Sequence, residues 1–252
     1  MSMNEAFFFG SGQNPVFANY HAPIRGSGHV LTVICPPLFH EYMLTQLALR
    51  NLAISLAETG QHVLRFDYRG TGDSSADLED VTISDWVEDI DAAVREGMEL
   101  SGSGVVRLVG IRASALLACH ALGKSIDVQR FVLWDPVPNG SEYLQSLRRI
   151  QVELLERDLL LSFSERRETC HEFAGYRLSE RMLEEFRLLD RSTYSKISAN
   201  KLYVVSTSPE VFLASPVHHA VVPFTCAWET NLDQLITPKP VLERITACLT
   251  LS

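Results

Sequence analysis

Short apolar runs alternate with helical patterns between residues 29 and 135. The runs are rich in β-branched and other apolar residues: HVLTVI (29–34), HVLRFD (62–67), VVRLV (105–109) and RFVLWD (130–135). Continuous apolar runs of this kind are typical of strands buried on both faces of a parallel sheet. Three helical patterns lie between these runs. The first covers 42–58, the second begins at a predicted N-cap, Ser84, and reaches Met98, and the third follows the run at 105–109 and ends at Leu122. The alternation predicts a doubly wound α/β fold.

Further strand patterns lie on both sides of this region. AFFF (6–9) and PVFANYH (15–21) flank GSGQN and predict a hairpin with a long turn. KLYVV (201–205) and AVVPFTCAW (220–228) resume the strand pattern, and PKPVLERITACL (238–249) predicts a closing helix with prolines near its start. The whole pattern therefore predicts a mostly parallel sheet of about eight strands.

A charged, helical segment interrupts the alternation between residues 141 and 196. One predicted helix carries an apolar stripe formed by Leu144, Leu147, Ile150 and Leu154, and a second lies around SERMLEEFRLL (179–189). The pattern predicts a core of residues 1–140 and 197–252, with a helical cap inserted at 141–196. Its mixed charges are typical of a solvated face. Its apolar stripe must be buried, either at the mouth of a pocket or against a partner subunit.

Composition narrows the range of partners and compartments. The formal net charge is −9 and no run of Lys and Arg stands out, which argues against nucleic-acid binding. The five cysteines are scattered without a CxxC pair, which favours reduced thiols over a disulfide framework or zinc site. No signal peptide is recognisable at the N-terminus, and no segment approaches the roughly 20 apolar residues that span a bilayer. We expect a cytoplasmic protein that binds no membrane.

The segment VRLVGIRASALLACHAL (106–122) has the pattern of a strand, a tight turn and a helix. In serine hydrolases built this way the turn reads Gly-x-Ser-x-Gly and presents the nucleophile. Here Gly110 and Ala113 keep the turn small, but Arg112 occupies the position of the serine. A guanidinium stays protonated and cannot attack a carbonyl. Ser114, two residues later, is either a displaced nucleophile or a small close-packing residue.

Four segments carry a resemblance to a known family: CPPLFHEYM (35–43), LRFDYRGTGDSS (64–75), VGIRASALLA (109–118) and LWDPVPNGSEYL (133–144). With the order of elements, they resemble the α/β-hydrolase superfamily. More narrowly, they are similar to a bacterial subgroup described as serine-aminopeptidase-like or exosortase-system-associated hydrolases. The resemblance covers nearly the whole chain. It implies an α/β-hydrolase fold with a helical cap, and a hydrolase-type activity.

The other members of a Ser-His-Asp triad are also missing from their usual places. In this fold the acid follows the seventh strand and the histidine follows the eighth. The only acidic residue soon after KLYVV is Glu210, and no histidine occurs between Glu229 and Ser252. His218 and His219 precede the predicted last strand, so we expect them at its amino end. The sequence predicts that the usual triad is absent.

The carboxyl ends of the strands, where open α/β sheets bind ligands, supply the candidate site. Arg112, beside the N-terminus of a helix, is a predicted receptor for a carboxylate, phosphate or phosphopantetheine-like group, with Glu41 and Asp135 as neighbours. His40 is a candidate acid or base, and Cys35 a candidate replacement nucleophile. The alternative for Arg112 is a structural ion pair with Glu41 or Asp135. The alternatives for the other residues are a capping or packing role for His40 and a turn role for Asp135.

Two functions remain open. One is a hydrolase or acyltransferase that acts on an acyl ester or thioester in a biosynthetic pathway by a non-serine route. The other is a catalytically inactive pseudo-hydrolase that binds an anionic ligand or a partner enzyme. Neither needs a cofactor or a metal. The expected partners are a small acyl or anionic substrate, a partner enzyme or carrier protein, and a second copy of the chain in a homodimer.

Overall fold

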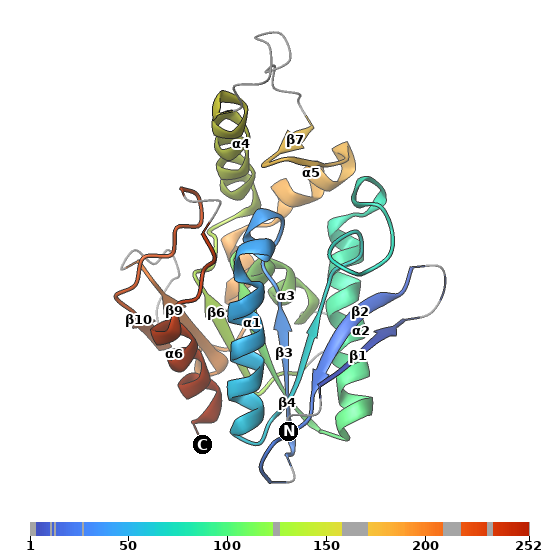
Figure 1. Cartoon of the computed structure of the whole chain (residues 1–252), viewed down its shortest axis with the longest axis vertical. Coiled ribbons are helices and arrows are strands. Elements are labelled where there is room, and N and C mark those ends of the chain that lie inside the picture. The colour runs from blue at the N-terminus through green and yellow to red at the C-terminus, as the bar shows by residue number, and fades with distance from the viewer. Residues whose placement is uncertain are drawn as a thin grey trace.

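A computed structural model describes residues 4–10, 12, 14–26, 28–122, 127–157, 171–208, 218–230 and 234–251. These residues form one eight-stranded sheet through the middle of the molecule, in the order β1-β2-β4-β3-β5-β6-β9-β10 (Figure 1). Its strands are β1 (Asn4–Phe9), β2 (Val16–His21), β3 (Val30–Cys35), β4 (His62–Phe66), β5 (Val105–Ile111), β6 (Arg130–Trp134), β9 (Leu202–Ser206) and β10 (His218–Val221).

Strand directions confirm the predicted mostly parallel sheet. β2 runs antiparallel to both β1 and β4, whereas every pair from β4 to β10 is parallel. The predicted N-terminal hairpin is β1–β2. All the carboxyl ends of the parallel strands therefore lie at one edge of the sheet, where the candidate residues follow them in sequence.

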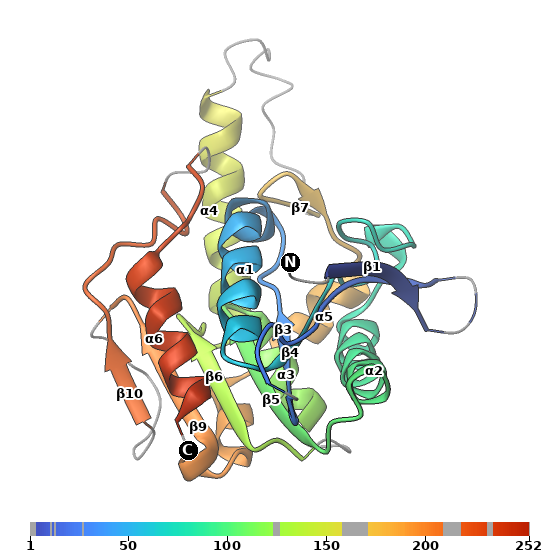
Figure 2. The same cartoon turned by 60° about the horizontal axis from the view of Figure 1, so that its bottom comes forward.

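Helices cover both faces of the sheet (Figure 2). The helices are α1 (His40–Glu58), α2 (Ile83–Ser101), α3 (Ser114–Leu122), α4 (Gly140–Arg157), α5 (Glu180–Leu188) and α6 (Lys239–Thr250). α1 and α6 bury their apolar side chains against one face, and α2 and α3 bury theirs against the other. Successive side chains of β4 point to opposite faces of the sheet. Leu64 and Phe66 therefore pack with α2 and α3, whereas Val63 packs with α1 and α6.

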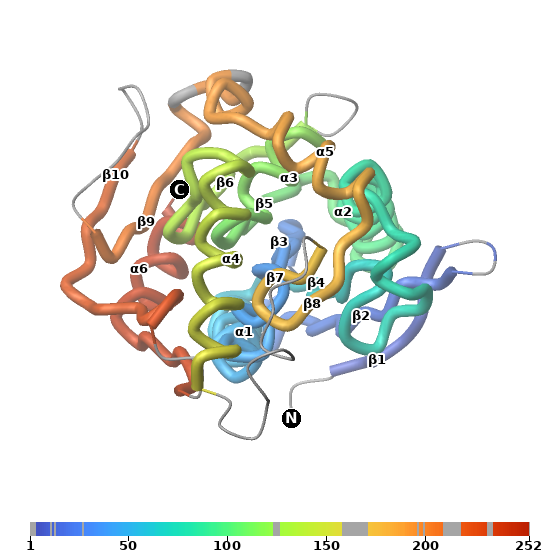
Figure 3. Tube along the Cα trace, turned by 90° about the horizontal axis from the view of Figure 1, so that it is seen from above, coloured from blue at the N-terminus to red at the C-terminus, as the bar shows by residue number. Residues whose placement is uncertain are grey.

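The segment after β6 lies above the carboxyl ends of the strands, as Figures 1 and 3 show. It contains α4, the short strands β7 (Glu172–Phe173) and β8 (Tyr176–Arg177), and α5. Three residues of the predicted stripe, Leu144, Leu147 and Ile150, are buried in the same core as α2 and α3, whereas Leu154 is exposed. Three of the four stripe residues are therefore buried in the core of this chain.

Phe39, directly before α1, joins this upper layer to the sheet. Its ring lies 5.3–6.3 Å from the rings of Trp86, Tyr143, Tyr176 and Phe186, which come from α2, α4, β8 and α5. Phe39 also has a positive φ of 55°. The main chain adopts a conformation that is unfavourable for a bulky residue, and the packing of the aromatic cluster offsets this cost.

Two predicted boundaries were wrong. The N-cap of α2 is Thr82 and not Ser84, because Thr82 and Asp85 form a reciprocal capping box one turn earlier. The last strand spans His218–Val221 and not 220–228. Pro223 lacks the N–H that would continue the ladder, so the chain leaves the sheet there. His218 and His219 consequently lie within the strand and not before it.

His21 gives the fold a measurable pH dependence. It is 1% exposed at the end of β2, and neither ring nitrogen has a hydrogen-bond partner among the described residues. Burial, helped by the positive charges of Arg65 and Arg50, lowers the pKa of His21 to about 4. The folded state therefore binds fewer protons than the unfolded state between pH 6.5 and 4, and stability falls as the pH falls through this window.

We expect the melting temperature of His21→Phe to fall less between pH 6.5 and 4 than that of the wild type. The exposed His29→Phe is the matched control and should follow the wild-type profile. Thermal melts at half-unit pH intervals measure the difference. Parallel profiles for wild type and His21→Phe would show that His21 does not carry this dependence.

Candidate functional site

The turn after β5 places Arg112 where an elbow presents its nucleophile. Arg112 has a φ of 53°, in a region that is strained for a residue with a side chain. Its N–H donates to the carbonyl of Trp134 at 3.0 Å. At Gly110, an added Cβ would lie 2.8 Å from the Cα of Ala115. A small residue is therefore required there, as predicted, and the strained turn directs Arg112 away from the sheet.

The guanidinium of Arg112 is already paired. Its Nε donates to Oε1 of Glu41 at 2.8 Å and its Nη1 to the carbonyl of Asp135 at 3.3 Å. Its Nη2 lies 3.8 Å from Oε1 of Glu229, and its Cζ lies 5.1 Å from the centre of the Trp228 ring. The side chain is 13% exposed. Burial disfavours the charge, but Glu41 outweighs burial and raises the pKa of Arg112.

Glu41 links three parts of the molecule. It lies in the first turn of α1, and its side chain is 1% exposed. One carboxylate oxygen accepts from Arg112, and the other accepts from the hydroxyl of Tyr143 on α4 at 3.0 Å. Burial and the charge of Glu41 raise the pKa of Tyr143 well above its ordinary value, so the hydroxyl keeps its proton. The ion pair thus joins the elbow, α1 and α4.

Asp135 is also saturated with hydrogen bonds. Its Oδ1 accepts from the main-chain N–H of Thr207 at 2.6 Å. Its Oδ2 accepts from the Thr207 hydroxyl at 2.8 Å and from Nε1 of Trp228 at 2.9 Å. Asp135 has a positive φ of 41°. The carboxylate of Asp135 therefore holds the loops after β9 and β10 in place, and both of its oxygens already accept hydrogen bonds from protein groups.

His40 lies beside the same tryptophan. Its Nε2 is 2.9 Å from the carbonyl oxygen of Trp228. A carbonyl only accepts, so Nε2 carries a proton. The other ring nitrogen, Nδ1, is buried and has no partner among the described residues. In the neutral ring Nδ1 is a free acceptor.

The two candidate nucleophiles are out of reach of a substrate. Cys35 is fully buried, and burial raises the pKa of its thiol to about 12, so no thiolate is present near neutral pH. Ser114 is also fully buried, and its hydroxyl donates to the carbonyl of Pro36. Both side chains therefore lie in the core of the structure, and the burial of Ser114 agrees with the packing alternative.

Asp67 and Arg69, which also follow a strand end, hold their own loop. Arg69 forms ion pairs with Asp89 at 2.6 Å and with Asp85 at 3.3 Å on α2. Asp67 accepts hydrogen bonds from the Tyr42 hydroxyl and from the N–H of Asp73. These contacts give both residues a structural role.

The sequence did not single out Tyr143, Trp228 and Glu229 as members of this site. Glu229 also pairs with Arg149 of α4 at 3.0 Å. Tyr143 has a weak signal, because it begins the helix that follows Asp135. Trp228 and Glu229 have no such sequence signal, because they lie in the irregular segment that follows β10.

Ser206 and His219 lie on β9 and β10, the strands near which this fold usually carries the acid and the histidine of its triad. Ser206, at the end of β9, donates to the carbonyl of Ser208 and lies 2.8 Å from Nε2 of His219. Glu210 lies outside the described residues. Within the described part of the chain, no group of three or more His, Cys, Asp and Glu residues could hold a metal ion. No described helix is both long enough and apolar enough to cross a membrane.

Comparisons with known proteins identify the fold. No protein-family model and no curated protein sequence matches the chain. Among solved structures, ferulic-acid-bound Est1E from Butyrivibrio proteoclasticus is 17% identical with a TM-score of 0.54, over 79% of this chain and 77% of that one. An esterase from Pyrococcus furiosus is 16% identical with a TM-score of 0.54, over 81% and 69%.

An α/β serine hydrolase homologue from Coxiella burnetii is 16% identical with a TM-score of 0.51, over 86% of each chain. At these identities the likeness concerns the fold alone. The chain has the α/β-hydrolase fold, as predicted. The narrower bacterial subgroup remains a prediction.

Proposed function

We propose that this chain is a pseudo-hydrolase: a protein of hydrolase fold that acts by binding a partner enzyme and not by hydrolysis. The observation that carries the proposal is the ion pair of Arg112 with buried Glu41 at the elbow. A nucleophile is needed at this turn for an acyl-enzyme to form. Arg112 cannot supply one, and the other two candidates are buried.

The surroundings of Arg112 also disfavour the anion that the sequence suggested as its ligand. Two carboxylates, Glu41 and Glu229, already lie within ion-pair distance of the guanidinium. An incoming carboxylate or phosphate would meet their negative charge, and it would have to displace Glu41 from a charge-assisted hydrogen bond. Of the two predicted ligand classes, a partner protein is therefore favoured over an anion at this position.

An active-site probe tests the proposal. A fluorophosphonate that reacts with activated serines should leave the full-length protein unlabelled, and Ser114→Ala should behave identically. The esterase-fold protein from Pyrococcus furiosus provides a positive control for the reagent. A stable adduct mapped to any serine at the strand ends would contradict the proposal.

One observation supports a second candidate function, a hydrolase or acyltransferase that uses a non-serine route. Nδ1 of His40 is buried and has no partner among the described residues, so it could accept a proton from a water or thiol that reached it. We expect that any hydrolysis of short p-nitrophenyl esters or acyl thioesters by the purified protein falls at least about 100-fold in His40→Ala. The exposed His29→Ala is the matched control and should retain the full rate. Equal rates in both variants would exclude His40 as the base.

A further inference from the structure

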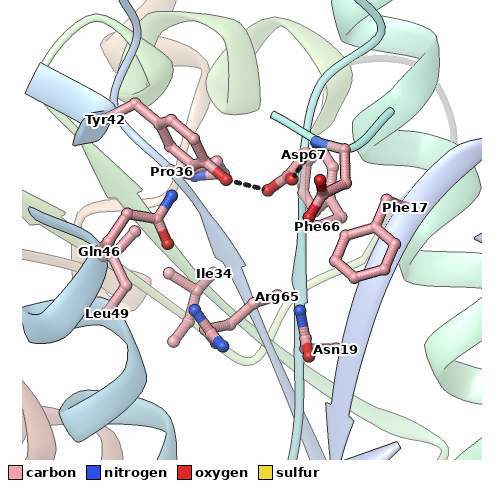
Figure 4. Close-up of a pocket in the computed structure, with 11 residues that line it drawn as sticks. Phe17, Asn19, Ile34, Pro36, Tyr42, Gln46, Leu49, Arg65, Phe66 and Asp67 are labelled. Atoms are coloured by element: carbon pink, nitrogen blue, oxygen red, sulfur yellow. Dashed lines mark hydrogen bonds between the residues drawn. The ribbon is translucent and has the colours of Figure 1, made fainter. Parts of the chain in front are cut away.

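A polar cavity lies on the α1 face of the sheet, away from the elbow. It has a volume of about 80 Å³ and is enclosed by β2, β3, β4 and α1 (Figure 4). Its polar lining comes from Asn19, Tyr42, Gln46, Arg65, Asp67 and Asp73. None of Arg112, Glu41 and Asp135 lines it. Whatever it binds is therefore independent of the proposed function.

The fold places an arginine in this cavity by strand alternation. Val63 and Arg65 point to the α1 face, because Leu64 and Phe66 point to the other. The register puts Arg65 opposite Asn19 of β2 and beside Ile34 of β3. In Figure 4 the side chains of Tyr42, Gln46 and Arg65 surround one space.

Arg65 lacks the partner that such a position requires. Its Nε is buried without a hydrogen bond, and its guanidinium forms no hydrogen bond or ion pair with the described residues. The nearest acid on the same strand end, Asp67, is engaged by the Tyr42 hydroxyl and the N–H of Asp73. Arg65 is partly buried, and the loss of hydration lowers the pKa of its guanidinium although the nearby charge of Asp67 opposes this effect.

A second arginine and a buried histidine lie near Arg65. Arg50, one turn beyond Gln46 on α1, is exposed and lies close enough to Arg65 for each charge to disfavour the other. His21, two residues from Asn19 on β2, is buried with both ring nitrogens unpartnered. The charges of Arg65 and Arg50 therefore lie close to each other and to a neutral imidazole, and no carboxylate among the described residues forms an ion pair with either arginine.

We propose that this cavity binds a small monovalent carboxylate, of the size of formate or acetate. Its two oxygens would accept from the planar fork of the Arg65 guanidinium, with the amide of Gln46 or Asn19 as an additional donor. The volume corresponds to roughly two or three waters at about 30 Å³ each, which suits a ligand of three or four heavy atoms. Asp67 and Asp73 also line the cavity, and their repulsion is stronger for a doubly charged phosphate than for a singly charged carboxylate.

Calorimetric titration with sodium acetate and sodium formate, in a chloride buffer, tests the proposal. We expect saturable binding of one carboxylate with a Kd on the order of 1 mM, and binding at least about 10-fold weaker in Arg65→Met, which loses a charged hydrogen bond. Arg95→Met is the matched control, because Arg95 is exposed on α2 at the opposite face, and it should bind like the wild type. Inorganic phosphate should bind more weakly than acetate.

A measurement on the wild type keeps the test independent of how Arg65→Met folds. Acetate should shift the NMR signal of the Arg65 Nε–H and the ring signals of His21 along one saturable curve. Absence of that shift would overturn the proposal. Equal affinity in wild type and Arg65→Met, or tighter binding of phosphate than of acetate, would also overturn it. Butyrate, with six heavy atoms, should bind poorly if the cavity sets the size limit.

Discussion

Replacing Arg112 with methionine lowers the free energy of unfolding by about 3–5 kcal/mol, because it leaves the Glu41 carboxylate buried without its cation. For a chain of this size the corresponding drop in melting temperature is on the order of 10 °C. Denaturant unfolding followed by circular dichroism measures the loss. A cost below about 1 kcal/mol would mean that Arg112 is a solvated, ligand-facing residue after all.

The double variant Arg112→Met, Glu41→Leu separates the ion pair from simple packing. Replacing both members of a buried pair with apolar residues is often neutral, so we expect the double variant to recover most of the stability lost in Arg112→Met. Arg149→Met serves as the control, since Arg149 is 64% exposed and, among the described residues, pairs with Glu229, which is 38% exposed. It should cost less than about 1 kcal/mol. A double variant no more stable than Arg112→Met would assign the loss to packing.

Replacing Phe39 with alanine costs about 3–5 kcal/mol, because it removes the ring at the centre of the aromatic cluster between the sheet and the segment above it. The rings of Tyr143, Tyr176 and Phe186 all lose a partner there. We therefore expect faster amide hydrogen exchange in α4 and α5 than in α1 or α2. Mass spectrometry of the exchanged peptides measures the difference.

Phe8→Ala is the control for this second prediction, because Phe8 is 57% exposed on β1 and should cost less than about 1 kcal/mol. Unchanged exchange in α4 and α5 of Phe39→Ala would show that these helices dock without the aromatic cluster. If the prediction holds, the layer above the strand ends is a fixed part of the core.

The sheet and most of its helices were predictable because their signals are local. A buried strand shows itself by a run of apolar residues, as in β3 and β5, and a helix by its spacing, as in α5. The errors occurred where a single side chain decided the boundary. The capping box of Thr82 and Asp85 starts α2 two residues earlier than predicted, and Pro223 ends β10 before the predicted end of the strand.

The elbow position of Arg112 could be predicted as well, because a strand, a small-residue turn and a helix are contiguous in the chain. So could the meeting of Glu41, Arg112 and Asp135, since each follows a parallel strand and those ends share one edge. The sequence left open whether Arg112 faces a ligand or an acidic partner. That choice depends on distances of a few ångström between residues 71 positions apart.

By itself, then, the amino-acid sequence determined the fold, the absence of a serine at the elbow and the set of charged residues near it. The tertiary structure decided that Glu41, held by Tyr143, pairs with Arg112, and that Trp228 and Glu229 lie beside the guanidinium. It also decided that Arg65 lies in a cavity without an ion-pair partner among the described residues. The physical reason is that periodicity reports burial along one segment, whereas the pairing of a charge depends on which distant segments pack against it.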